Sequence, residues 1–273
     1  MRRFLLLLLL LTAVCSTAQP ASFAMAAQSA LDGGFASPAV SYLLLDAEGR
    51  VLAQRWPEGG QTPVSPGSLL KPWLALAYGE QHSGVFPHAY CQGAASHCWL
   101  AHGHGQLELQ EAIAVSCNAY FLQLAGGLDR SRARYTLSRY HLQGPDTDAT
   151  DGNLIGLGDT WKESPLALAR AYLTLASERN RPTQATLLRG MQASAAHGTA
   201  KAVGQALGQN AVFAKTGTAT CSHHPRAPGD GFTLALYPAA QPRMLLLVRV
   251  HGVNGAASAG TAAAMLRLLG ATR

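Results

Sequence analysis

Lysine is scarce in this chain, and one of its lysines follows a serine by three residues. Only four of the 21 Lys and Arg residues are lysines: Lys71, Lys162, Lys201 and Lys215. A desolvated lysine can lose its proton, whereas an arginine effectively never does. In S-P-G-S-L-L-K-P, at 65–72, Ser68 and Lys71 share one face of a helix start and form a candidate nucleophile with its base. The simpler interpretation is a capping serine followed by a surface lysine.

A second serine lies inside an apolar segment, A-I-A-V-S-C-N-A-Y-F. Ser116 and Asn118 interrupt a run that otherwise faces a core, and buried polar groups need partners. As functional residues, Ser116 would pass a proton toward a leaving group and Asn118 would hold a substrate amide. As structural residues, they would bond only to nearby backbone.

The third group of candidates is the stretch Lys215-Thr216-Gly217-Thr218. A lysine and two hydroxyl groups beside a strand glycine can hold a carboxylate, so all four are candidate substrate-binding residues. The amides of Thr218 and Ser68 are candidate donors to an oxyanion. An edge strand with a glycine bulge is the structural alternative.

The order of the three groups is itself informative. S-x-x-K, a second serine motif and K-T-G together form the signature of serine acyl-enzymes that react with penicillin. Two of the four lysines fall inside these motifs. The sequence therefore predicts catalytic Ser68, Lys71, Ser116 and Asn118 in one cleft.

Alternating and helical patterns indicate the elements that must position these residues. The two ends of the chain are strand-rich and the middle is helical, which predicts a mixed α/β (α+β) fold. Its central antiparallel sheet is built from N- and C-terminal strands and flanked by helices, with an inserted all-helical lobe at about 66–205. We expect strands at 41–46, 51–54, 211–218, 232–237 and 244–250, and helices at 68–78, 109–125, 165–176, 186–196 and 256–269.

The N-terminus predicts export. Arg2 and Arg3 precede an apolar run at 4–14 that is too short to cross a bilayer and typical of a signal peptide. We expect cleavage after residue 18 or 26, a short mature leader at 27–38 and a single domain at 39–273. Lipidation at Cys15 is an alternative. The predicted location is extracytoplasmic, or periplasmic, with no transmembrane helix after cleavage.

Four cysteines remain after the leader. Cys91 and Cys98 enclose a short polar loop and are predicted to form a disulfide. The alternative is a zinc site with His97, His102 and His104, but we predict no metal and no cofactor. The net charge of +6 is modest and no basic stretch is interleaved with aromatics, so nucleic acid is not an expected partner.

Beyond the three motifs, several blocks resemble one known family. P-G-S-L-L-K-P, S-C-N-A-Y-F and A-K-T-G-T-A are similar to the motifs of penicillin-binding protein transpeptidase domains. The stretches at 98–109, 155–172 and 198–201 also resemble this family, the first of them its cell-elongation members. The resemblance runs from about residue 40 to the C-terminus.

The resemblance implies an acyl-enzyme on Ser68 formed with a D-alanyl-D-alanine stem peptide of peptidoglycan. Lys71 would be the base, Ser116 the proton relay, and the K-T-G-T stretch the carboxylate site. β-Lactams would react as mimics, and cell-wall proteins would be partners. Transpeptidase and carboxypeptidase activity both stay open, as does a sensor of β-lactam or cell wall; a β-lactamase ranks lower because no E-x-x-L-N pattern surrounds Glu163. Cys117 is either free or paired with a cysteine such as Cys221.

Overall fold

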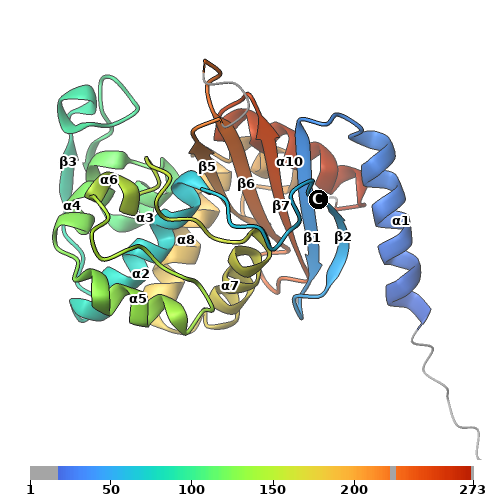
Figure 1. Ribbon diagram of the computed structural model, residues 1–273, viewed down its shortest axis with the longest axis horizontal. Coiled ribbons are helices and arrows are strands. Elements are labelled where there is room, and N and C mark those ends of the chain that lie inside the picture. The colour runs from blue at the N-terminus through green and yellow to red at the C-terminus, as the bar shows by residue number, and fades with distance from the viewer. Residues whose placement is uncertain (1–17, 222–225, 272–273) are drawn as a thin grey trace, which may run out of the picture.

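The computed structural model describes residues 18–221 and 226–271 of the chain (Figure 1). The start of the predicted leader, with Cys15, lies outside the described residues. A sheet flanked by helices forms one half of the molecule, and a group of helices forms the other half beside it (Figure 1). No helix within the described residues has the length and apolar character needed to cross a membrane.

Strands from both ends of the chain pair in one five-stranded antiparallel sheet. The strand order β2-β1-β7-β6-β5 places β1 against β7, with Val40 opposite Val250 and Asp46 opposite Met244. This pairing confirms the predicted fold class. The strands are β1 (Val40–Asp46), β2 (Val51–Arg55), β5 (Phe213–Ala219), β6 (Asp230–Tyr237) and β7 (Met244–His251).

The central strands are apolar on both sides because helices cover both faces of the sheet. Along β1, Leu43 and Leu45 enter the core shared with the helical lobe, whereas Tyr42 and Leu44 enter a second core on the opposite face. Successive side chains of a strand point to opposite faces, so a continuous apolar run is what such a sheet requires. Three helices supply most of the helical part of the second core, α1 (Ala18–Gly34), α9 (Lys201–Leu207) and α10 (Gly255–Leu268), and Ala195 near the end of α8 (Pro182–Ala196) also belongs to it.

The lobe inserted between β2 and β5 was predicted to be all-helical, and this prediction is wrong. It contains a small antiparallel hairpin, in which Ala89 lies opposite Leu107 and Cys91 opposite Gly105. Strands of three residues are too short to give an alternating pattern, so the sequence did not indicate them. The hairpin strands are β3 (Ala89–Cys91) and β4 (Gly105–Leu107), and the lobe helices are α2 (Lys71–Gln81), α3 (Leu109–Ala114), α4 (Asn118–Gly126), α5 (Arg130–Ser138), α6 (Asp151–Leu154), α7 (Pro165–Ser177) and α8 (Pro182–Ala196), with 3-10 turns η1 (Gly67–Leu70) and η2 (Gly93–Ser96).

The helix predicted over 109–125 is wrong, because the chain breaks between α3 and α4. Ser116 adopts φ +54°, a left-handed conformation that is uncommon outside glycine, and Cys117 is extended. The apolar pattern continues through the break, so periodicity alone suggested one helix. The break turns the Ser116 side chain out of the helical path.

The segment predicted as a short mature leader at 27–38 begins inside helix α1. Ala27 and Leu31 of this helix are buried in the second core, four residues apart on one face. The Gln28 side chain also accepts a hydrogen bond from the Gln54 amide of β2 at 2.9 Å. Cleavage after residue 26 would therefore cut α1 in two, whereas cleavage after residue 18 would keep nearly all of it.

Two glycines bring the start of the lobe against the sheet. A Cβ atom at Gly67, which has φ +58°, would collide with the backbone of Thr218. A Cβ atom at Gly217 would collide with the carbonyl oxygen of Pro66. Glycine at both positions allows η1 to touch β5, with no side chain between the two backbones.

We predict that Gly217→Ala destabilises the protein by about 1–3 kcal/mol, because the added methyl group has no room beside the Pro66 carbonyl. The matched control is Gly260→Ala in α10, where a Cβ atom meets nothing within 4 Å. That helical substitution should leave the melting temperature unchanged or raise it. Thermal unfolding of both variants checks the prediction, and equal melting temperatures for the two would contradict it.

Candidate active site

The three predicted motifs meet at one pocket where η1, the start of α4, β5 and the start of α10 come together. The pocket has a volume of about 360 Å³. Six of the eight predicted residues line it: Ser68, Ser116, Asn118, Thr216, Gly217 and Thr218. The remaining two, Lys71 and Lys215, are fully buried. Segments far apart in the sequence are thus combined into one site.

Lys71 is a buried amine at the start of α2. Its Nζ donates to the Ser116 carbonyl oxygen at 2.7 Å and to Asn118 Oδ1 at 2.6 Å, and lies 3.4 Å from Ser116 Oγ. Desolvation lowers the pKa of Lys71 to about 7, although the nearby thiols of Cys117 and Cys98 oppose the shift. A substantial neutral fraction near pH 7 makes Lys71 able to act as a base.

Lys215 is the second buried amine and approaches the same serine from β5. Its Nζ donates to Ser116 Oγ at 2.9 Å and to the Thr216 carbonyl oxygen at 2.7 Å. Desolvation holds the pKa of Lys215 well below its usual value, and repulsion from Lys71 lowers it further. Two ammonium groups close to one hydroxyl would repel each other. At a given pH, Lys71 and Lys215 together therefore carry less positive charge than two exposed lysines would.

Ser116 is the polar centre of the site. Its carbonyl oxygen accepts from Lys71 and also from Trp99 Nε1 at 3.2 Å, while its hydroxyl lies between the two amines. Its left-handed φ of +54° is a strained conformation for a serine. The break between α3 and α4 thus aims one residue at both lysines.

Ser68 lies on η1, directly before α2, and its hydroxyl opens into the pocket. Tyr172 Oη donates to the Leu69 carbonyl oxygen at 2.7 Å, which fixes the turn from the lobe side. Within the described residues the structure records no hydrogen bond from the Ser68 hydroxyl, since the Lys71 amine is engaged by Ser116 and Asn118. Such contacts are often loose without substrate and tighten in the reactive complex.

The strand β5 presents two hydroxyl groups to the pocket. Thr216 Oγ1 donates to Thr199 Oγ1 at 2.6 Å, and Thr218 Oγ1 accepts from the Gly255 amide at 2.9 Å. Gly255 is the first residue of α10, so a helix N-terminus borders this side of the pocket. The positive end of that helix and the buried amine of Lys215 both favour an anionic ligand here.

Sequence reasoning missed some of the lining residues. Thr199 was part of the block at 198–201, so its signal was present although no role was assigned to it. Trp99 and Leu157 line the pocket with 55% and 51% of their surface exposed. They lie in the blocks at 98–109 and 155–172, so a signal was present for them too, but an exposed large apolar side chain leaves no mark in sequence periodicity that would assign it a role.

Glu163, the acid considered for a lactamase, serves the structure and does not reach the pocket. It is buried and accepts from Trp161 Nε1 at 2.8 Å, from the Gly144 amide at 3.0 Å and from the Gln143 amide at 3.1 Å. With three hydrogen-bond donors, the Glu163 carboxylate has the partners that a buried polar group needs. None of the described residues lining the pocket is acidic.

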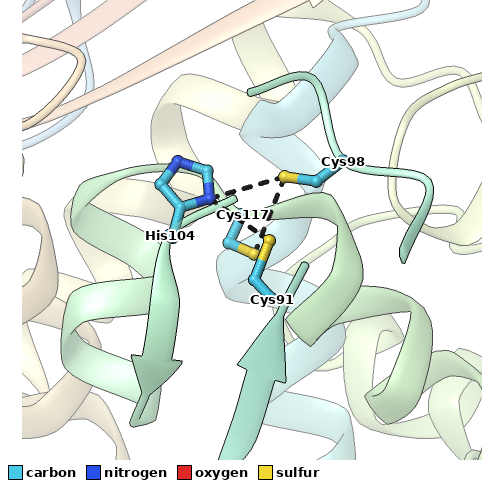
Figure 2. A group of neighbouring side chains, drawn as sticks. All are labelled: Cys91, Cys98, His104 and Cys117. Atoms are coloured by element: carbon cyan, nitrogen blue, oxygen red, sulfur yellow. Dashed lines mark hydrogen bonds between the residues drawn. The ribbon is translucent and has the colours of Figure 1, made fainter. Parts of the chain in front are cut away.

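The disulfide predicted between Cys91 and Cys98 is wrong, because both are free thiols. Their sulfur atoms lie 3.6 and 3.5 Å from His104 Nδ1, and Cys117 joins the same group (Figure 2). The sulfur atoms of Cys98 and Cys117 are separated by 3.8 Å, against about 2.05 Å in a disulfide. Cys117 is also a free thiol, which is the first of the two alternatives given for it. The group in Figure 2 is the set of residues near the pocket best suited to hold a metal.

Comparison with known structures supports the same architecture. Pseudomonas aeruginosa PBP2, in complex with WCK 5153, has a TM-score of 0.74 at 20% identity, covering 90% of this chain and 73% of that one. Helicobacter pylori PBP2, in its complex with MreC, has a TM-score of 0.71 at 19% identity, covering 89% and 63% respectively. Mycobacterium tuberculosis PBPA has a TM-score of 0.69 at 19% identity, covering 90% and 79%. At these identities the likeness concerns the fold, and this chain spans less than two thirds of the Helicobacter protein.

A comparison with curated proteins gave no significant match. The family described as the penicillin binding protein transpeptidase domain matches residues 55–269. That segment includes all three motifs, the pocket and most of both lobes. The chain therefore belongs to the penicillin-binding protein transpeptidase domain family.

Proposed function

We propose that this protein is a penicillin-binding serine acyl-transferase that acts on D-alanyl-D-alanine stem peptides through an acyl-enzyme on Ser68. One observation carries the proposal: two buried amines, Lys71 and Lys215, converge on Ser116 directly beside a pocket that Ser68 lines. A neutral buried amine next to a serine is the arrangement that activates a hydroxyl without a histidine.

The first step is attack of Ser68 Oγ on the carbonyl carbon of the penultimate D-alanine. The hydroxyl proton passes to neutral Lys71, and the new C–O bond gives a tetrahedral intermediate. Its oxyanion is placed between the backbone amides of Ser68 and Thr218, on the two segments that Gly67 and Gly217 bring into contact.

The second step expels the terminal D-alanine. The C–N bond breaks and the leaving amine takes the proton from Lys71 by way of the Ser116 hydroxyl, which lies 3.4 Å from Lys71 Nζ. Lys215 donates to that hydroxyl oxygen, which favours release of the hydroxyl proton to the leaving amine, and the proton held by Lys71 then replaces it. The ester on Ser68 and a free D-alanine are the products.

The terminal carboxylate of the stem peptide binds at β5. The hydroxyls of Thr216 and Thr218 face the pocket beside the buried Lys215 and the start of α10. β-Lactams carry a carboxylate next to a reactive amide and would take the same place. Asn118, also on the pocket wall, is positioned to bind the substrate amide.

The acyl group then passes to an amine, giving a cross-link, or to water, giving carboxypeptidase activity. A fast β-lactamase needs a general base for the deacylating water. Glu163 is fully engaged elsewhere and no acidic side chain lies among the described lining residues, so a slowly hydrolysed adduct is favoured.

The proposed place of action is outside the cytoplasm. Support comes from Arg2 and Arg3 followed by the short apolar run at 4–14. Peptidoglycan stem peptides are the substrate of this proposal and cell-wall proteins its partners. The Helicobacter relative forms a complex with MreC, which motivates the idea of a partner protein.

We predict that a fluorescent penicillin labels the protein covalently and that Ser68→Ala abolishes the label, because the ester cannot form without the hydroxyl. The matched control is Ser65→Ala, three residues earlier on the same segment, which should label like the wild type. Gel fluorescence and intact mass measure the adduct. Undiminished labelling of Ser68→Ala would contradict the assignment.

We predict that the acylation rate rises with pH and levels off above neutrality. The pKa of Lys71 is about 7, so the neutral, proton-accepting form grows from a minority below that pH to a majority above it. Rates of penicillin acylation between about pH 5.5 and 8.5 give the profile. Lys71→Arg, which stays charged, should lose about 10²–10⁴-fold in rate.

The control for that substitution is Lys201→Arg on the exposed side of α9. It should keep both the wild-type rate and the wild-type profile. A rate that is flat or falls over the same range would argue against Lys71 as the base.

We predict that a D-alanyl-D-alanine stem-peptide analogue is turned over with release of D-alanine, while the penicillin adduct persists. Mass spectrometry of the peptide products, with and without an added amine acceptor, separates transfer from hydrolysis. A stable adduct without peptide turnover would indicate a sensor, and rapid loss of the penicillin label would indicate a β-lactamase.

A further inference from the structure

Four metal-ligand atoms converge beside the pocket, where the β3–β4 hairpin meets α4. Cys91, Cys98, His104 and Cys117 each offer one atom, and the four atoms all lie within 4.8 Å of one another (Figure 2). The three cysteines are buried and His104 is partly buried. Figure 2 shows the sulfur atoms and the imidazole ring pointing toward a common centre.

The measured separations match a tetrahedral zinc centre. Zinc bonds of about 2.3 Å to sulfur and about 2.05 Å to nitrogen at tetrahedral angles require sulfur pairs about 3.8 Å apart and sulfur–nitrogen pairs about 3.6 Å apart. Cys98 and Cys117 are 3.8 Å apart, and His104 Nδ1 lies 3.5 Å from Cys98 and 3.6 Å from Cys91. A Cys₃His ligand set is one of the common structural zinc sets.

Hydrogen bonding among thiols explains the cluster less well. A neutral imidazole nitrogen has one lone pair, so His104 Nδ1 can accept from only one of the two sulfurs that it touches. The other ring nitrogen, Nε2, is buried without a hydrogen-bond partner within the described residues. The polar contacts of the ring recorded within the described residues are therefore all to sulfur, and its other contact is edge-on packing against Trp99.

The hairpin is a small unit, held mainly by backbone hydrogen bonds of its short ladder and its loop. Its strands are three residues long, and Gly93 and Gly103 bring the loop backbones so close that a Cβ atom at either would collide. Small units with little core are commonly held by a metal or a disulfide. An ion bound by Cys91, Cys98 and His104 from the hairpin and by Cys117, the N-cap residue of α4, would join the hairpin to that helix.

The ligands are chain neighbours of two pocket residues. Cys98 precedes Trp99 and Cys117 follows Ser116, and Trp99 Nε1 donates to the Ser116 carbonyl oxygen at 3.2 Å. The same oxygen accepts from Lys71. Fixing Cys98 and Cys117 on one ion would fix Trp99 over the pocket and hold Ser116 in its strained conformation.

We propose that Cys91, Cys98, His104 and Cys117 bind one zinc ion, and that this ion positions Trp99 and Ser116 for acylation. Three thiols lose their protons to solvent on binding, and the neutral imidazole supplies the fourth bond, so no oxidation or reduction takes place. The coupling to acylation rests on the proposed function, whereas the zinc site does not.

The first test measures the metal in protein purified under reducing conditions. Wild type should contain about one zinc per chain, and cobalt in its place should give the intense visible bands of a tetrahedral thiolate site. His104→Ala should lose the zinc and His104→Cys should regain it, because a fourth thiolate completes the set. Wild-type protein with neither zinc nor the cobalt spectrum would overturn the proposal.

Two control variants exclude other origins of the metal. His102→Ala changes an exposed histidine of the same loop, and Cys221→Ser changes a cysteine that lies near Asp230 and His251. Both should keep one zinc. Loss of zinc from Cys221→Ser together with its retention in Cys98→Ser would place the metal at that second group and refute the site. If Cys98→Ser fails to fold, the pair of His104 variants decides.

The second test removes zinc from the folded wild type with a chelator and follows penicillin acylation. The rate should fall by at least about tenfold and recover when zinc is returned. Unchanged acylation by zinc-free protein would refute the coupling and leave the site. Zinc binding without any acylation would refute the proposed function and the coupling together, again without touching the site.

Discussion

The burial of two amines around one serine is the constraint on which the rest of the site depends. Lys71 and Lys215 come from different lobes, and both lie close to the Ser116 hydroxyl. Water is excluded from both, which lowers the pKa of each and frees an amine to accept a proton. The constraint also links the lobes, because the sheet and the helical insertion each supply half of the arrangement.

Burying two amines and straining the backbone of Ser116 both lower the free energy of unfolding, and the packing of the surrounding structure offsets this loss. Lys71 begins α2, whose next six residues are all buried, so the amine cannot turn out to solvent. Ser116 is held in a strained backbone conformation by donors from Lys71 and Trp99. Sites that break local rules in this way persist only where the scaffold over-determines them. Here the scaffold includes the glycine contacts that lock η1 against β5.

The sequence predicted the site best where the functional residues form short local motifs. The three motifs lie on the segments expected for them, and the strands at both ends pair as their apolar patterns indicated. Local patterns could not show the break at Ser116, because the apolar run continues through it and the left-handed turn is imposed by partners distant in the chain. They also could not show that Cys117 joins Cys91 and Cys98, since that meeting depends on how the hairpin folds over α4. Helix α1 was missed for a different reason: its sequence continues the composition of the predicted leader.

The distribution of charge around the pocket bears on the fate of an acyl-enzyme. Two buried amines, Lys71 and Lys215, lie beside it, and its walls carry hydroxyls, the side-chain amides of Asn118 and Asn254, and exposed apolar surface from Trp99 and Leu157. This set of groups favours a ligand that carries a carboxylate. Under the proposed function, it also leaves no carboxylate among the described lining residues to activate water after the first product leaves. Under this function, an incoming amine would need less help than water, because a neutral amine is the better nucleophile. Under the proposed function, the charge pattern that admits the donor peptide therefore also protects the ester until an acceptor arrives.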